Sequence, residues 1–304
     1  MAEARLVRRA VFPAAGLGTR FLPVTKAQPK EMLPLVDKPT IQYGVEEAIA
    51  SGIEQVVMVT AAGKRAIVDH FDRSFELEFY LRQRGKTDLL QVLDSVDGLS
   101  DRVDLNYVQQ KDPLGLGHAV WTARRLVDGE ACAVLLADDV ILGAEPCLGQ
   151  LIRVHEETGA TVLAARRVPR DQIGRYGIIA PGESRGRTHE VTDVVEKPDP
   201  DSAPSDLAIL GRYVLAPDVF QALDRTAAGA GQEIQLTDAI KATIATGRVV
   251  AHEFEGDYYD TGTVPGWLRA NLALALRRSD LRETMLEVIR ELVDGPGAGA
   301  GAPV

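Results

Sequence analysis

Residues 12–33 read FPAAGLGTRFLPVTKAQPKEML, and this stretch decides the fold class because an apolar strand runs directly into a glycine-rich turn. Residues 10–14 are expected to form that strand. Gly16 and Gly18 lie in the turn, where small residues let the backbone approach a ligand and successive N–H groups can form an anion-binding nest. A tight turn that binds nothing is the alternative interpretation of a single Gly-x-Gly.

Two familiar phosphate-binding loops do not fit this turn. A dinucleotide fingerprint requires a third glycine at the position of Phe21, and a P-loop ends in Gly-Lys-Ser/Thr where this chain has Gly-Thr-Arg. Three cations follow instead, Arg20, Lys26 and Lys30, in a chain whose net charge is −10. Arginine matches phosphate geometry through its planar fork, and lysine acts as a point charge. The segment therefore favours phosphate binding, with a solvated basic loop as the alternative.

The rest of the chain predicts an α/β fold. Apolar runs of strand length alternate with amphipathic segments, as in a parallel sheet covered on both faces. Strands are expected at 10–14, 55–61, 105–108, 131–137, 161–166, 176–179, 191–195, 209–215 and 249–254, and helices at 41–51, 64–71, 118–126, 237–246, 265–278 and 281–293. Residues 72–103 have no clean period and are expected to form an insertion beside the sheet. The low-complexity tail at 295–304 is expected to be disordered.

The composition of the chain limits the number of its domains and the kinds of molecule that it binds. The chain has 304 residues, 45% of them hydrophobic, enough for one large domain or two smaller ones. Its acidic balance disfavours nonspecific binding to nucleic acid or to an anionic membrane. No apolar run long enough for a membrane span and no signal-peptide pattern is found, so we expect a cytoplasmic protein. The two cysteines, Cys132 and Cys147, agree with that compartment, and the five scattered histidines make a zinc site improbable.

Two acidic sites follow strand-like segments. Asp138 and Asp139 come directly after the apolar run at 133–137, and ligands of open α/β sheets bind beyond the carboxyl ends of strands. Adjacent carboxylates are costly to desolvate without a cation, and oxygen ligands suit Mg²⁺. Capping of the next turn is the alternative. Asp260, in the sequence YYDTG, is the second acidic site; an N-cap for the helix near Pro265 is its alternative.

Several further motifs follow the glycine-rich turn in a fixed order. They are GKRAI at 63–67, DHFD at 69–72, FELE at 75–78, PLGLGHA at 113–119, RYG at 175–177, EKP at 196–198 and EIQLTD at 233–238. Together with the turn, this ordered set resembles the sugar-1-phosphate nucleotidyltransferases and, more narrowly, the bacterial UTP–glucose-1-phosphate uridylyltransferases. The resemblance implies a single Rossmann-like domain at 8–278, built around a mixed, largely parallel sheet flanked by helices. It also implies that the helix at 279–294 contributes to an oligomer contact.

The resemblance also implies roles for individual residues. Nucleotide-binding positions correspond to Ala14, Ala15, Gly16, Gly18, Glu31, Gln110 and Gly115. Catalytic, phosphate-binding positions correspond to Arg20, Lys30 and Lys197, and sugar-binding positions to Gly177, Glu196, Lys197, Gly211 and Glu233. The ligands of a Mg²⁺ ion correspond to Asp138 and Asp260. Val264 stands where many close relatives carry lysine, which weakens the correspondence near Asp260.

The activity that the resemblance implies is the reaction of UTP with glucose 1-phosphate to give UDP-glucose and pyrophosphate, in a homodimer or homotetramer. The sugar phosphate attacks the α-phosphorus of UTP directly, with Mg²⁺ assisting. A thymidylyl- or cytidylyltransferase of the same family is one alternative. A non-catalytic relative that binds a nucleotide sugar and regulates a partner is another. Phe21 argues against a nicotinamide oxidoreductase, because it occupies the third glycine position.

Overall fold

The structure is a computed structural model that describes residues 7–229 and 232–294 of the 304-residue chain. The tail at 295–304, for which the sequence predicts disorder, lies outside the described residues. No helix within the described ranges is long and apolar enough to cross a membrane.

A mixed sheet organises the described part of the chain, with nine strands in the order β5-β4-β1-β6-β11-β8-β12-β10-β9. The strands are β1 (Arg9–Pro13), β4 (Gln55–Thr60), β5 (Asp104–Gln109), β6 (Cys132–Leu135), β8 (Thr161–Arg167), β9 (Gly177–Arg185), β10 (Thr188–Glu196), β11 (Leu207–Leu215) and β12 (Val249–Glu253). Strands β5, β4, β1 and β6 are parallel, whereas β11 is antiparallel to both β6 and β8. The predicted α/β fold with a mixed sheet is confirmed.

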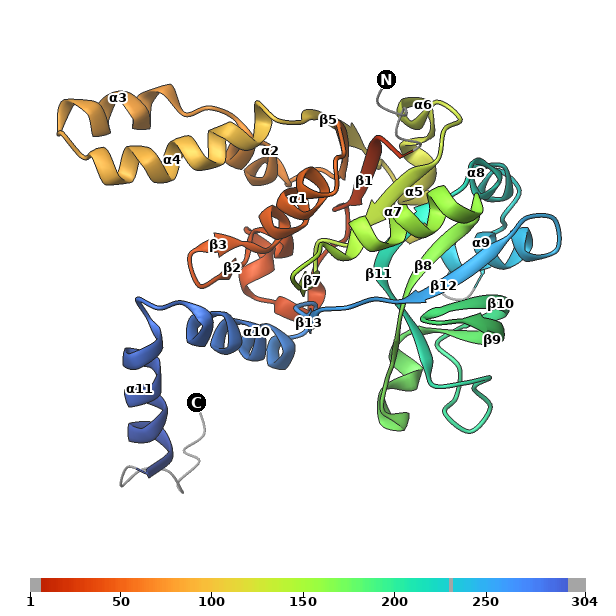
Figure 1. Cartoon of the computed structure of the whole chain (residues 1–304). Helices are drawn as coiled ribbons and strands as arrows, with labels where there is room; N and C mark the ends of the chain where they lie inside the picture. The colour runs from red at the N-terminus through yellow and green to blue at the C-terminus, as the bar shows by residue number, and fades with distance from the viewer. Residues whose placement is uncertain (1–6, 230–231, 295–304) are drawn as a thin grey trace.

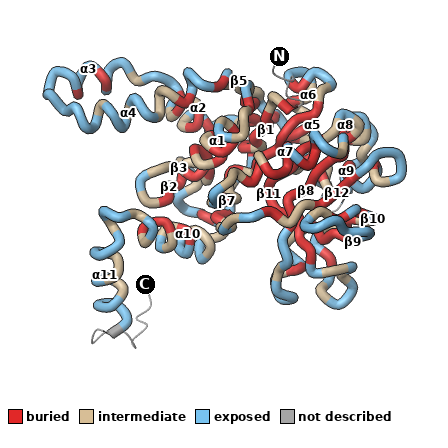
Figure 2. Tube along the Cα trace, in the orientation of Figure 1, coloured by how far each residue is buried: buried red, intermediate tan, exposed pale blue. Residues whose placement is uncertain are grey.

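Helices cover both faces of this sheet (Figure 1). One face carries α1 (Thr40–Ala50), α2 (Arg65–Phe71) and α7 (Cys147–Thr158), and the other carries α5 (Leu116–Thr122), α6 (Arg124–Val127), α8 (Pro217–Leu223) and α9 (Leu236–Ile244). Strand β1 serves both cores because alternate side chains point to opposite faces: Phe12 packs with the α1 side, and Val11 packs with the α5 side. Buried residues accordingly concentrate along the strands (Figure 2).

Two short ladders next to the sheet, four strands in all, are absent from the pattern-based prediction. Strand β7 (Asp139–Leu142) pairs with β13 (Asp257–Asp260) in an antiparallel ladder, and β2 (Pro34–Leu35) pairs with β3 (Lys38–Pro39). These ladders pack with α10 (Val264–Arg277) through a small core. Strands of two to four residues carry too little periodicity to be recognised in the sequence. Helices α7 and α8 were also not predicted, and the helix expected at 118–126 divides into α5 and α6 at Ala123.

Two helical extensions leave the body of the molecule. The insertion expected at 72–103 is a pair of adjacent helices, α3 (Phe75–Gln83) and α4 (Thr87–Ser100), that project from the sheet (Figure 1). Helix α11 (Arg282–Asp294) extends from the end of α10 at a second corner. Figure 2 shows both extensions to be mostly exposed. The boundary that the sequence places between residues 278 and 279 stays a prediction.

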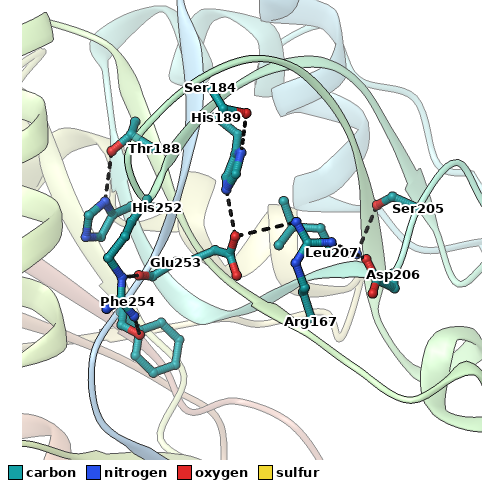
Figure 3. A network of polar contacts seen from close by, with 11 residues as sticks. Arg167, Ser184, Thr188, His189, Ser205, Asp206, Leu207, His252, Glu253 and Phe254 are labelled. Atoms are coloured by element: carbon teal, nitrogen blue, oxygen red, sulfur yellow. Dashed lines mark hydrogen bonds and ion pairs between the residues drawn. The ribbon is translucent and has the colours of Figure 1, made fainter.

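A network of polar contacts joins β8, β9, β10 and β12, at the end of the sheet opposite to β5 (Figure 3). His189 on β10 contacts Glu253 Oε1 on β12 through Nε2, at 2.8 Å, and Ser184 Oγ on β9 through Nδ1, at 2.7 Å. Glu253 Oε1 also lies 3.7 Å from Arg167 on β8. The network therefore connects four strands and contains none of the predicted site residues.

Candidate functional site

A cavity of about 560 Å³ opens where β1 and β6 end, beside the glycine-rich turn. Nine of the predicted site residues line it: Ala15, Gly16, Gly18, Arg20, Lys30, Gln110, Gly115, Asp138 and Glu233. They come from the turn after β1, the 3₁₀ helices η1 (Thr19–Phe21) and η3 (Lys30–Met32), and the loops after β5, β6 and α8. Ala14 is buried behind this surface. The fold thus brings distant motifs to one edge of the sheet, as expected for an open α/β sheet.

Two glycines at the cavity are required by their surroundings. Gly18 has φ 67°, and a Cβ there would lie 3.2 Å from the side chains of both Lys30 and Thr25. Gly115 has φ 96°, and a Cβ would lie 2.8 Å from Glu233 Cβ. Positive φ and crowding both exclude larger residues at these positions. The glycines therefore allow the turn and the loop before α5 to close around the cavity.

Lys30 and Asp138, which both line the cavity, form an ion pair with Nζ 2.6 Å from Oδ2. Burial alone would raise the pKa of the Asp138 carboxyl, but the nearby Lys30 ammonium outweighs it and holds that pKa below its usual value. Burial alone would lower the pKa of Lys30, but the carboxylates of Asp138 and Glu31 raise it. Both groups are therefore charged at neutral pH.

Glu31 lies beneath this ion pair, and it does not line the cavity. Its side chain is buried, and Oε2 accepts a 2.6 Å hydrogen bond from Lys64 Nζ. Oε1 is buried without a hydrogen-bond partner among the described residues. Burial raises the pKa of Glu31 and lowers that of Lys64. The nucleoside contact expected of Glu31 stays a prediction, and Lys64 is a site neighbour for which only the GKRAI motif gave a sequence signal.

Asp139, next to Asp138 in the chain, does not line the cavity. Tyr258 donates a 2.6 Å hydrogen bond to its Oδ1, and burial followed by the neighbouring Asp138 carboxylate raises the pKa of Asp139 to about 7. A Cβ on Gly211 would lie only 2.0 Å from Asp139 Oδ2. Gly211 is buried in β11, so its observed role is to leave space for Asp139. The sugar contact expected of Gly211 stays a prediction.

The β7–β13 ladder brings the second predicted metal ligand to the first. Asp260 pairs with Asp139 in register, and the Thr261 N–H and hydroxyl both donate to the Asp138 carbonyl at 2.8 Å. A Cβ on Gly262 would lie 2.9 Å from Asp138 Oδ2 and 3.2 Å from Asp260 Oδ1. Two carboxylate oxygens therefore face the same small space, which only a glycine leaves open.

This space fits the ligand preferences of magnesium. Within the described ranges, no group of three or more His, Cys, Asp or Glu side chains is arranged to hold a metal ion. A magnesium site needs fewer, since the ion is usually held by one or two carboxylates, with substrate phosphates and water as its other ligands. Asp138 and Asp260 supply that number beside a cavity large enough for a nucleotide.

Three of the five predicted sugar-binding residues, Gly177, Glu196 and Lys197, gather at the end of β10. Lys197 Nζ lies 3.2 Å from Glu196 Oε1, and Glu196 Oε2 accepts a 2.7 Å hydrogen bond from the Thr237 hydroxyl. A Cβ on Gly177 would approach the same Oε2 to 3.2 Å. Thr237 is an addition that the sequence suggested only through the EIQLTD motif. Gly177, Glu196 and Lys197 thus lie together, outside the residues that line the 560 Å³ cavity, and their contacts with the sugar stay a prediction.

Lys197 has a strained backbone. Its φ is 45°, a left-handed conformation that costs a residue with a Cβ free energy and is further disfavoured before proline. The conformation is held by the hydrogen bond from the Lys197 N–H to the Tyr176 carbonyl, 3.0 Å long. Strain of this kind persists where the surrounding structure imposes it, often at functional sites.

Arg175 connects the sugar-binding cluster with the acidic cluster. It ends the 3₁₀ helix η4 (Arg170–Arg175), one residue before Tyr176, and its guanidinium forms an ion pair with Asp260 Oδ2. The RYG motif contained this residue, but no role followed from the sequence.

Comparisons with known proteins identify the family of the chain. A sequence model of the family Nucleotidyl transferase matches residues 9–276. A UTP–glucose-1-phosphate uridylyltransferase of Bacillus subtilis (strain 168) is 49% identical over 288 residues, which cover 95% of this chain and 98% of that protein. The enzyme of the same name from Staphylococcus haemolyticus (strain JCSC1435) is 49% identical over 286 residues, covering 94% of this chain and 98% of the relative.

Solved structures give the same result. A UDP-glucose pyrophosphorylase complexed with UDP-glucose superposes with a TM-score of 0.83 at 39% identity, covering 90% of this chain and 100% of that one. A UTP-bound enzyme from Acinetobacter baumannii superposes with a TM-score of 0.87 at 39% identity, covering 94% and 99%. On the evidence of its sequence, its fold and the residues at its cavity, the chain belongs to the nucleotidyl transferase family, in the branch of the bacterial UTP–glucose-1-phosphate uridylyltransferases.

Proposed function

We propose that this enzyme transfers the uridylyl group of UTP to glucose 1-phosphate, giving UDP-glucose and pyrophosphate. The observation that carries the proposal is a single cavity in which the glycine-rich turn, Arg20, Lys30 and Asp138 meet. Glu196 and Lys197 form a second cluster of site residues. Arg175 connects this cluster with the acidic residues, because it forms an ion pair with Asp260. Relatives that are 49% identical over nearly their whole length carry the name of this activity.

The chemistry requires alignment and charge neutralisation. A phosphate monoester has its second pKa near about 6, so the sugar phosphate is already a nucleophile at neutral pH. One of its oxygens forms a bond to the α-phosphorus of UTP, and the bond to pyrophosphate breaks on the opposite side. Arg20 and Lys30 bind the triphosphate and stabilise its developing charge, while Lys197 holds the sugar phosphate in line. Glu196 accepts hydrogen bonds from sugar hydroxyls.

Asp138 and Asp260 would hold the Mg²⁺ ion. When bound, the ion would neutralise charge on the phosphate oxygens of both substrates. The geometry that supports this assignment is the convergence of two carboxylate oxygens next to Gly262.

We assign the recognition of uracil to the backbone around Ala15 and Gly16 together with Gln110. The Gln110 Nε2 donates to the Gly115 carbonyl at 3.2 Å and contacts His118 Nδ1 at 2.8 Å. With Nε2 turned toward these partners, Oε1 is the acceptor for the single N–H on the uracil edge. Thymine has the same edge, so discrimination against dTTP depends on space around the base and the ribose.

We further propose a cytoplasmic homo-oligomer. Helices α3 and α4 expose Phe75, Phe79 and Val92, and α11 exposes Leu292, so both extensions present apolar side chains outside the body. A second copy of the chain is the partner that the family resemblance implies. The two cysteines are free and buried, in keeping with a reducing compartment.

The test is pyrophosphate release from glucose 1-phosphate with UTP, dTTP, CTP and ATP compared side by side, each with magnesium and with EDTA. We expect the fastest release with UTP and none with EDTA. Faster release with dTTP or CTP would replace the uridylyl assignment by one of the related transferases. Folded protein that binds UDP-glucose but releases no pyrophosphate with any nucleotide would be the non-catalytic relative.

A matched pair of variants tests the metal assignment. Asp138→Asn should lose magnesium-dependent turnover by at least about two orders of magnitude, as expected when an electrostatic contact to the reacting phosphates is lost. Asp193→Asn, which changes an exposed carboxylate paired with Lys241, is the control and should keep its rate. Equal rates for the two variants would remove Asp138 from the site.

A further inference from the structure

Each carboxylate that faces the space beside Gly262 is already paired with a cation of the chain. Lys30 neutralises Asp138, and Arg175 neutralises Asp260 through Oδ2. The other oxygen of Asp260, Oδ1, accepts a 2.9 Å hydrogen bond from the Gly262 N–H. The cations of the chain therefore compensate the charges of both carboxylates, although the two acidic side chains lie close together.

Lys30 and Arg175 differ in how firmly they are held. Lys30 is mostly buried, its side chain 23% exposed, and belongs to the wall of the nucleotide cavity. The Arg175 side chain is 45% exposed, and its guanidinium forms the ion pair with Asp260 and lies 5.7 Å from the centroid of the Tyr176 ring. Water reaches the Arg175 side of this pair, although the Asp260 side chain is only 23% exposed. A divalent cation carries twice the charge of the guanidinium, so it can displace Arg175 from Asp260.

The backbone position of Arg175 gives its guanidinium a second target. The next residue, Tyr176, accepts the hydrogen bond from the Lys197 N–H, and a Cβ on Gly174 would lie 3.6 Å from the Pro198 carbonyl. Arg175 is thus anchored against the turn that carries the proposed sugar-phosphate lysine. A guanidinium released from Asp260 would therefore be available to a phosphate bound by Lys197, and a guanidinium can bind a phosphate in a bidentate manner.

We propose that Arg175 is a substrate-binding residue that exchanges partners: it neutralises Asp260 while no metal is bound and turns to the phosphate of the sugar phosphate when a divalent cation takes Asp260. The inference rests on the proposed function, because it takes Asp260 as a metal ligand. Mutual repulsion between a divalent cation and the guanidinium drives the exchange, since both compete for one carboxylate. Metal binding and sugar-phosphate binding are thereby coupled through one side chain.

The first test measures metal binding without substrates. Free Mn²⁺ is titrated by electron paramagnetic resonance into the wild type, Arg175→Gln, Arg175→Lys and Arg170→Gln. Removal of the competing cation should tighten Mn²⁺ binding by Arg175→Gln at least about two- to five-fold, because an ion pair with one exposed partner contributes no less than a fully exposed one. Arg170 lies in the same 3₁₀ helix but pairs with the exposed Asp201, so Arg170→Gln should bind like the wild type. Arg175→Lys keeps the charge and should stay close to the wild type.

The second test separates the two substrates. The KM for glucose 1-phosphate should rise about tenfold or more in Arg175→Gln, the size expected for a lost charged hydrogen bond, while the KM for UTP changes little. Unchanged or weaker Mn²⁺ binding by Arg175→Gln would overturn the proposed exchange, as would an unchanged KM for glucose 1-phosphate.

Asp260→Asn separates this inference from the function on which it rests. If Asp260→Asn weakens Mn²⁺ binding and Arg175→Gln leaves it unchanged, the metal assignment stands and the role of Arg175 is wrong. If neither substitution changes Mn²⁺ binding, Asp260 is not a ligand, and the metal part of the proposed function fails together with the exchange.

Discussion

Lys197 combines an unfavourable backbone with a long cationic side chain. Its φ of 45° would suit glycine, yet the chain places lysine there, directly before Pro198. A left-handed conformation costs a residue with a Cβ about 1–2 kcal/mol relative to glycine. The position therefore has a cost in stability that a function of the ammonium group can explain.

Replacing this lysine should separate stability from activity. Lys197→Gly and Lys197→Ala should both lose most turnover, because neither can hold the sugar phosphate. Lys197→Gly should nevertheless be more stable than Lys197→Ala by about 1 kcal/mol, since only glycine relieves the strain. Urea unfolding and the pyrophosphate assay measure the two quantities. Retained turnover in Lys197→Gly would show that the backbone alone, and not the ammonium, matters at this position.

Gly211 offers a prediction about packing beneath the acidic pair. A Cβ there would lie 2.0 Å from Asp139 Oδ2 and 2.7 Å from Leu136 Cβ, so Gly211→Ala should destabilise the protein by about 1–3 kcal/mol. Gly98→Ala is the control, because Gly98 has open space around it in α4 and should gain about 0.5–1 kcal/mol. Both are measured by urea unfolding. Equal stability of Gly211→Ala and the wild type would mean that Asp139 moves freely.

At the scale of elements, short strands and a 3₁₀ helix position most of the acidic and basic side chains of the site. The β7–β13 ladder has four residue pairs, and it sets Asp260 beside Asp139 and hence next to Asp138. The 3₁₀ helix η3 directs Lys30 toward Asp138 while it turns Glu31 toward Lys64. Neither element is long enough to be stable alone, so both depend on the sheet and on α10 for support.

The α3–α4 extension is the element for which association is predicted. Phe79 on α3 and Val92 on α4 are each 63% exposed, and burying them against a second copy would remove apolar surface from water. The double variant Phe79→Ser/Val92→Ser should therefore have a lower mass by analytical ultracentrifugation than the wild type. Gln91→Ser, an exposed polar position on α4, is the control and should not change the mass. An unchanged mass for the double variant would move the predicted contact to α11.

At the scale of the whole molecule, a buried ion pair between β11 and α1 supports the segment that carries Asp138 and Asp139. Arg212 is fully buried on β11 and donates to Glu47 Oε2 on α1 at 2.8 and 3.0 Å. It also donates to the carbonyls of Leu136 and Asp139, at 3.0 and 2.7 Å. The loop that carries the acidic pair is thus held from below by one guanidinium.

Breaking the ion pair between Arg212 and Glu47 should lower the free energy of unfolding. Arg212→Met leaves Glu47 charged and buried without its partner, so we expect a loss of about 3–5 kcal/mol in the free energy of unfolding. The double variant Arg212→Met/Glu47→Met removes both charges and should recover part of that loss. Urea unfolding measures both. A double variant no more stable than Arg212→Met would show that the bonds to the two carbonyls, rather than the ion pair, carry the stability.

Much of the fold and of the site is local in origin and was predictable. The strands at 10–14, 55–61 and 131–137 appear as β1, β4 and β6 because continuous apolar runs have few alternatives to a buried parallel strand. The site residues next to these strands follow from them, since a turn after a parallel strand lies at the ligand-binding edge. The helical pair at 72–103 was less predictable, because its exposed apolar residues obscure the amphipathic period.

The sequence by itself determined the fold class, the glycine-rich turn and the order of the motifs, because each depends on residues that are neighbours along the chain. Only the tertiary structure decided that Asp260 pairs in register with Asp139, that Arg175 pairs with Asp260, and that Lys64 pairs with Glu31. These contacts join segments far apart in the sequence. They depend on strand order, on the register of β7 with β13 and on burial, and a pattern along one chain contains none of this information.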